Sequence, residues 1–123
     1  MKIKLSGEKL DFNVSEICDQ VEKILDIAVT DREECNIVAL KDDNDFQRET
    51  SAIFGLNIGK VGGVYVHATG TIYIDKSTAT KYLIGHELAH ALLMRYFLTP
   101  VSEVIMEVLA GYVEYKMRQA NGN

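Results

Sequence analysis

Apolar residues recur every three or four positions in three long stretches of this chain, a spacing that predicts amphipathic helices. The helices are expected over residues 15–29 with Ser15 as N-cap, from an N-cap at Ser77 to Phe97 or Leu98, and over 101–118 behind Pro100. The last helix should bury one apolar stripe: Val104, Ile105, Val108, Leu109, Tyr112 and Val113. Its end, at residues 121–123, is expected to fray.

Shorter apolar runs rich in β-branched residues predict strands. They are expected over residues 2–5, over 9–13 as a strand pairing back on the first, over 36–40 as a central strand, and over 64–67 and 71–74 as a hairpin. The acidic residues 41–45 suit a surface turn that caps the next segment, and residues 46–54 form either a short helix or an irregular excursion. Helices and strands together predict an α+β fold.

Length and charge limit the classes of protein that this chain can belong to. At 123 residues it is long enough for one domain with a modest core, so we expect a single domain over residues 1–123. A net charge of −5 without a Lys/Arg cluster argues against nucleic-acid binding. No secretory leader or membrane-length apolar run is evident, and Cys18 and Cys35 form no C-x-x-C motif. We therefore expect a cytoplasmic protein with free thiols and no membrane partner.

Residues 86–90 read His-Glu-Leu-Ala-His and lie within the second predicted helix. Residues four apart on a helix lie one turn apart on the same face, with Cβ atoms about 5–6 Å from each other. At that spacing the imidazoles of His86 and His90 can both bind one Zn²⁺ ion. Glu87 then lies beside the metal, where it can accept a proton from a metal-bound water. The alternative is two histidines on an ordinary amphipathic helix without metal.

A zinc site needs at least one more protein ligand, and the last helix offers three carboxylates: Glu103, Glu107 and Glu114. If the last two helices form an antiparallel hairpin, Glu107 lies level with His90, whereas the other two lie about a turn too far away. Gly111 opposite His86, with Ala110 beside it, should allow close helix packing. Burial of a carboxylate on an apolar stripe also favours a metal partner. We therefore predict His86, His90 and Glu107 as zinc ligands, against the alternative of Glu107 paired to a Lys or Arg.

HELAH followed by Glu107-Val-Leu-Ala-Gly resembles the gluzincins, zinc peptidases whose third ligand is a glutamate on a later helix. The small size is similar to the minigluzincins, and an ImmA/IrrE-type peptidase is a second candidate because TIYI, a polar turn and HELAH occur there in that order. The resemblance covers about residues 62–115. It implies a minimal zincin-like domain, with a small, mostly antiparallel sheet packed on the motif helix and a following antiparallel helix.

These observations favour a zinc metallopeptidase acting on a peptide or protein substrate. Glu87 is the expected general base, and one strand of the hairpin can pair with an extended substrate. The donor for the oxyanion stays open among four side chains: His67, Tyr96, Tyr112 and Tyr115. The alternative function is a catalytically weak or latent zinc-binding regulatory module, because so short a chain has little protein to form the far wall of a cleft.

Overall fold

A four-stranded mixed sheet forms the centre of the computed structural model, which describes residues 1–97, 99 and 101–121. The helices are α1 (Val14–Leu25), α2 (Asp43–Phe54), α3 (Lys81–Tyr96) and α4 (Glu103–Ala120), and the strands are β1 (Lys2–Gly7), β2 (Glu34–Leu40), β3 (Gly63–Val66) and β4 (Thr71–Asp75). The α+β class is confirmed. The predictions on Leu98, Pro100 and residues 122–123 lie outside the described residues.

The sheet has the strand order β1-β2-β4-β3 and is not mostly antiparallel, so that prediction is wrong. β1 pairs with β2 and β2 with β4 in parallel, whereas only β3 and β4 form the antiparallel hairpin. Residues 9–13 form no strand, because Leu10 and Phe12 instead pack against the core. The chain then returns through α1, the kind of helical crossover that parallel strands require.

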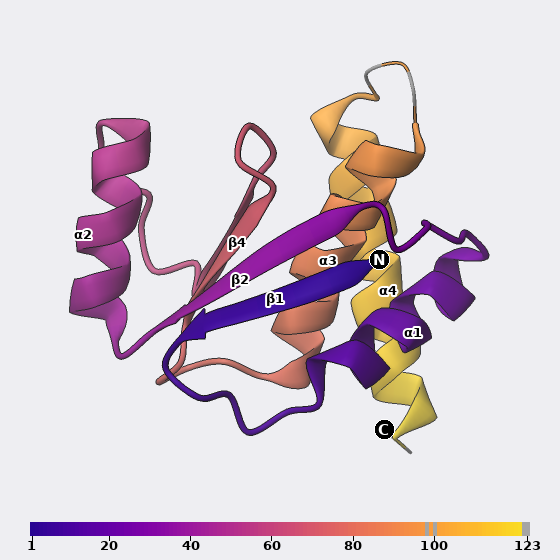
Figure 1. Ribbon diagram of the computed structural model, residues 1–123, viewed down its shortest axis with the longest axis horizontal. Coiled ribbons are helices and arrows are strands. Elements are labelled where there is room, and N and C mark those ends of the chain that lie inside the picture. The colour runs from indigo at the N-terminus through magenta and orange to yellow at the C-terminus, as the bar shows by residue number, and fades with distance from the viewer. Residues whose placement is uncertain (98, 100, 122–123) are drawn as a thin grey trace.

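Helices cover both faces of the sheet. α2 lies on one face, whereas α1, α3 and α4 lie together on the other (Figure 1). The core between the sheet and the three helices is built from fully buried side chains, including Ile37, Ile72, Ile74, Ile84, Leu88 and Leu92. Burying each such side chain contributes about 1.5–3 kcal/mol. α3 is therefore packed between the sheet and α4.

The turn from β4 into α3 is organised by Asp75, which is buried. Its Oδ1 accepts hydrogen bonds from the backbone N–H and the hydroxyl of Ser77, at 2.9 and 2.6 Å. Ser77 is therefore not the N-cap of α3. That position belongs to Thr80, whose hydroxyl accepts from the N–H of Leu83 at 3.1 Å. The start of α3, and with it the rotation of the motif, is set by these contacts.

The starts of α1 and α2 can also be compared with the predictions. α1 is capped by Asn13 rather than Ser15, and it ends at Leu25, earlier than expected. Asp42 caps α2 by accepting from the N–H of Asp45 at 2.9 Å, so the acidic segment is the predicted capping turn. Residues 43–54 form a regular helix.

α4 buries a stripe that shares Val113 with the predicted one but is otherwise different. Its buried residues are Met106, Ala110, Val113 and Met117, whereas most of the predicted stripe is exposed. The reason lies on α3, where a Cβ on Gly85 would lie 2.3 Å from Sδ of Met117. The close approach between the helices is therefore at Gly85. Among the described residues, no atom beyond the adjoining backbone of α4 lies within 4 Å of a Cβ on Gly111, so the expectation of close packing there is wrong.

Candidate metal centre

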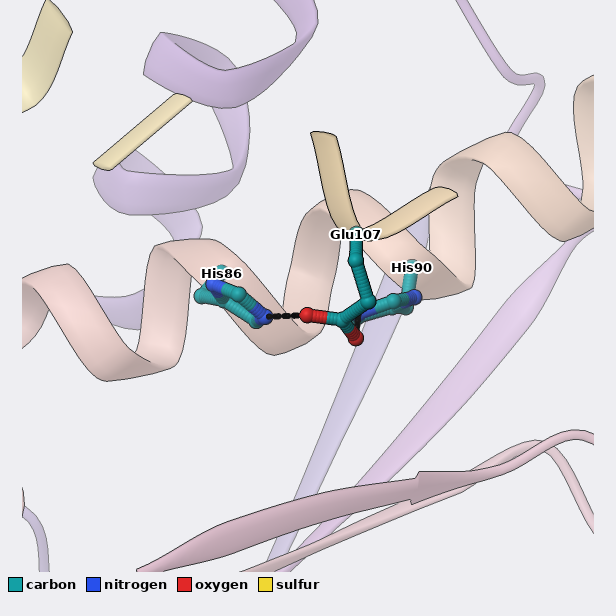
Figure 2. A group of neighbouring side chains, drawn as sticks. All are labelled: His86, His90 and Glu107. Carbon is teal, nitrogen blue, oxygen red and sulfur yellow. Dashed lines mark ion pairs between the residues drawn. The ribbon is translucent and has the colours of Figure 1, made fainter. Parts of the chain in front are cut away.

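His86 and His90 lie one turn apart on the same face of α3, and Glu107 of α4 reaches toward both (Figure 2). The two rings are 5.1 Å apart between centroids and are tilted by 53°. Nε2 of His86 lies 3.3 Å from Oε2 of Glu107, and Nε2 of His90 lies 2.7 Å from Oε1. One carboxylate therefore approaches the same nitrogen atom of each imidazole.

This geometry fits a metal ion held by two imidazoles and one carboxylate. One ligand atom from each of His86, His90 and Glu107 lies within 4.8 Å of the others, so the group can hold a metal ion. Two ligands about 2.0–2.1 Å from a tetrahedral zinc lie roughly 3.3 Å apart, close to the separation of His86 and Glu107. The shorter His90–Glu107 contact has to lengthen slightly around such an ion.

Glu107 is the carboxylate predicted as the third ligand on the assumption of an antiparallel helical hairpin. In the structure it lies beside both histidines. Glu107 is not buried, contrary to the prediction, because its side chain is 62% exposed. Its place on the rim leaves the centre accessible from solvent. Glu103, the first of the three carboxylates on α4, is not a member of the group.

Glu87 is nearly buried, with 6% of its surface exposed, and it lines the same cleft as His90 and Glu107. Burial raises the pKa of its carboxyl to about 7; His86 lowers this pKa, and Glu107 and Glu114 raise it. A general base works best when its pKa is near the working pH. The buried position of Glu87 therefore suits a group that accepts and releases a proton.

The space for the Glu87 side chain depends on a glycine in β3. A Cβ on Gly63 would lie 3.4 Å from Cγ of Glu87 and 3.1 Å from Cδ1 of Ile74. The glycines of residues 62–63 therefore allow close packing beside the motif helix.

His90 also has a shifted pKa. Burial lowers the pKa of the imidazole below its ordinary value, against the opposite influence of Glu107 and together with that of His86. The neutral form of histidine is the one that binds metal ions. The surroundings of His90 therefore favour the ligating form near neutral pH.

Glu114 makes a contact that the sequence argument did not foresee. Its Oε1 lies 2.5 Å from Nδ1 of His86, on the opposite side of the ring from Glu107. This Nδ1 is buried and has no well-aligned hydrogen bond, so the contact is a close polar approach with the oxygen out of line. The sequence spacing could have indicated this contact, because Glu114 follows Glu107 by two helical turns and so lies on the same side of α4.

The side chains that line the cleft in front of the centre reduce the number of candidates for an oxyanion donor. Besides Glu87, His90 and Glu107, it is lined by His67 and Tyr65, by the carboxylate Glu103 of α4, and by the apolar side chains Val64, Met94, Val101 and Met106. Tyr96, Tyr112 and Tyr115 are half exposed and do not line it. Tyr65 was not considered from the sequence, although side chains two apart on a strand lie on the same side, and this could have linked it to His67.

No model of a known protein family, no curated protein and no solved structure matches this chain. Within the described residues, no helix combines the length and the apolar content that crossing a bilayer demands.

Proposed function

We propose that this protein is a zinc-dependent peptidase, with His86, His90 and Glu107 as the metal ligands and Glu87 as the general base. The observation that carries the proposal is the place of Glu87, a nearly buried carboxylate in the same cleft as a group that can hold a metal ion. The two imidazoles and one carboxylate match the ligands of catalytic zinc sites, which leave one position open. The resemblance of HELAH and Glu107 to the gluzincins favours the same function.

Zinc, when bound, lowers the pKa of a water molecule toward ~7 and polarises a carbonyl group. Glu87 takes the proton of the attacking water and delivers it to the leaving amine nitrogen. Burial raises the pKa of Glu87 to about 7, so the carboxyl can perform both transfers near neutral pH. His90 stays neutral, and Glu107 supplies one negative charge to the centre.

An extended peptide or protein segment is the proposed substrate. β3 is an edge strand of the sheet, and two of its residues, Val64 and Tyr65, line the cleft. A substrate strand can add to such an edge through main-chain hydrogen bonds. This would place a peptide bond of the substrate in front of Glu87.

Replacing Glu87 with Gln tests the mechanism. The variant should bind one zinc per chain, because Glu87 is not a ligand, and it should lose cleavage of a broad peptide library. Glu49→Gln on α2, across the sheet from the centre, is the matched control and should behave like wild type (Figure 1). Full activity in Glu87→Gln would refute the mechanism, and absence of zinc from wild type would refute the metal centre.

The exposed surface of α4 favours a second candidate, a latent zinc-binding interaction module. Val104 and Val108 are 73% and 65% exposed, and Tyr112 and Tyr115 are about half exposed. Exposed apolar groups on one element are typical of protein-binding surfaces. Bound zinc without cleavage of any peptide in the library would favour this module over the peptidase.

A further inference from the structure

Arg95 of α3 connects the metal helix to Tyr65 of β3. Its side chain is only 9% exposed, and its Nη1 donates hydrogen bonds to the Tyr65 hydroxyl at 2.5 Å and to the carbonyl of Ala91 at 2.9 Å. Its Nη2 donates to the carbonyl of Glu34 at 2.6 Å, and Nε lies 3.5 Å from Oε2 of Glu33. These partners hold the guanidinium in one position.

The direction of these hydrogen bonds favours one of the two neutral forms of His67. A guanidinium can only donate, so the Tyr65 oxygen accepts from Arg95. The hydroxyl proton of Tyr65 is then free for Nδ1 of His67, which lies 3.0 Å away. This arrangement favours Nδ1 as the acceptor, and with it the neutral imidazole that carries its proton on Nε2.

The Tyr65 hydroxyl keeps its proton at neutral pH. Burial raises its pKa above the ordinary value, although Arg95 acts in the opposite direction. Tyr65 can therefore donate to His67 over the whole range in which a zinc peptidase would work.

We infer that His67 donates a hydrogen bond from Nε2 to the carbonyl oxygen of the peptide bond under attack, with Tyr65 and Arg95 as positioning residues. His67 lines the cleft that also contains Glu87 and His90, and its other ring nitrogen is occupied by Tyr65. The inference rests on the proposed peptidase function. It adds a hydrogen bond that strengthens as negative charge develops on that oxygen, and no proton leaves the imidazole.

His67 fits this role better than the other side chains considered. It lies immediately after β3, the edge strand beside which a substrate is proposed to bind. Its own surface is exposed, so a substrate can reach it without rearrangement of the fold. Tyr65, by contrast, is half-buried and uses its hydroxyl to orient the imidazole.

The test is steady-state kinetics on the zinc-loaded full chain, for wild type, His67→Ala, His67→Gln and Tyr65→Phe. Loss of one such donor typically lowers kcat on the order of 10²–10³-fold. We expect that loss in His67→Ala with KM little changed, partial recovery in His67→Gln, which keeps an N–H donor, and a smaller loss in Tyr65→Phe. Thr69→Ala, on the same exposed turn, is the control and should match wild type.

A second readout does not depend on activity. ¹⁵N NMR of histidine-labelled protein should find His67 protonated on Nε2 in wild type, and a mixture of both neutral forms in Tyr65→Phe. Cleavage by wild type with unchanged kcat in His67→Ala, or a wild-type His67 protonated on Nδ1, would overturn this inference alone. A zinc-loaded wild type that cleaves no peptide would overturn the proposed function and this inference together.

Discussion

The carboxylate of Glu114 lies 2.5 Å from Nδ1 of His86, while Glu107 approaches Nε2 of the same ring. α4 therefore provides both a candidate metal ligand and a group that faces the back of another ligand. A carboxylate on the second nitrogen of a ligating histidine fixes the orientation of the ring and makes it more basic. Although the contact is not an aligned hydrogen bond, the carboxylate of Glu114 lies behind the ring, where it would make His86 a stronger ligand for a metal ion.

Replacement of Glu114 with Gln is expected to weaken zinc binding by roughly 10–100-fold, as is typical when such a carboxylate is removed. The reason is that the imidazole of His86 loses the charge behind it while all three ligands remain. Competition with a chelator of known affinity measures the change. Glu49→Gln on α2 removes the same charge far from the centre and should leave the affinity unchanged. Equal affinities in both variants would contradict the role of Glu114.

Zinc should stabilise the folded protein through His86, His90 and Glu107, because only the folded state brings these ligands together. At a free zinc concentration of about 100 Kd the gain is about 2.7 kcal/mol, on the order of 10 °C in Tm for a domain of this size. Thermal unfolding with and without a chelator measures it. Glu107→Ala should lose most of the shift, whereas Glu103→Ala should keep it.

Replacement by alanine of Gly85 in α3 and of Gly111 in α4 should change the stability of the protein in opposite directions. Gly111→Ala should raise the free energy of unfolding by roughly 0.5–1 kcal/mol, because alanine favours a helix and the new Cβ meets no other element of the described structure within 4 Å. Gly85→Ala should lower it by about 1 kcal/mol, because the new Cβ displaces the fully buried Met117 at a cost of about 1–3 kcal/mol. Urea unfolding measures both changes. A gain in stability from Gly85→Ala would show that Met117 moves without cost.

Cys18 and Cys35 should make the free energy of unfolding decrease as the pH rises through the alkaline range. Burial is the main cause that raises the pKa of these thiols, to about 12 for Cys18 and to about 11 for Cys35, from an ordinary value of 9.0. Between pH 9 and 11 the unfolded chain loses these protons while the folded protein keeps them. The free energy of unfolding therefore falls as pH rises, by up to about 1.4 kcal/mol per pH unit for each thiol.

Urea unfolding between pH 8 and 11 measures this dependence. The double variant Cys18→Ala and Cys35→Ala should show a flatter profile, even though its stability at pH 8 is lower. Both native thiols should also react slowly with iodoacetamide at pH 8, because the thiolate is the reactive form. Rapid alkylation without unfolding would contradict the burial of the two thiols.

The face of α4 shows where reasoning from the sequence failed. Two apolar stripes run along this helix, and both have helical spacing, so periodicity could not choose between them. The stripe that contains Ala110 and Met117 packs inward, because Gly85 of α3 has room for the thioether. The same rotation turns Glu107 and Glu114 toward His86.

Two other features could not be predicted from the sequence for a similar reason: the parallel pairing of the strands and the hydrogen bonds that link Arg95 through Tyr65 to His67. Short runs of apolar residues predicted β1 and β2 but contained no information on the direction in which they pair. Arg95 and Tyr65 are 30 residues apart, and their hydrogen bond depends on how α3 packs against the hairpin. Contacts of this kind arise only when separate elements come together.

The sequence by itself determined what the geometry of one helix, or of two consecutive helices, can determine. Four-residue spacing places His86 and His90 on one face of α3, and the short connection to α4 brings Glu107 level with His90. The tertiary structure decided which stripe of α4 is buried, how the strands pair, and which groups approach His86 and His67 from behind. The physical reason is that local periodicity sets which residues share a face, whereas packing against a neighbouring element selects the face that is used.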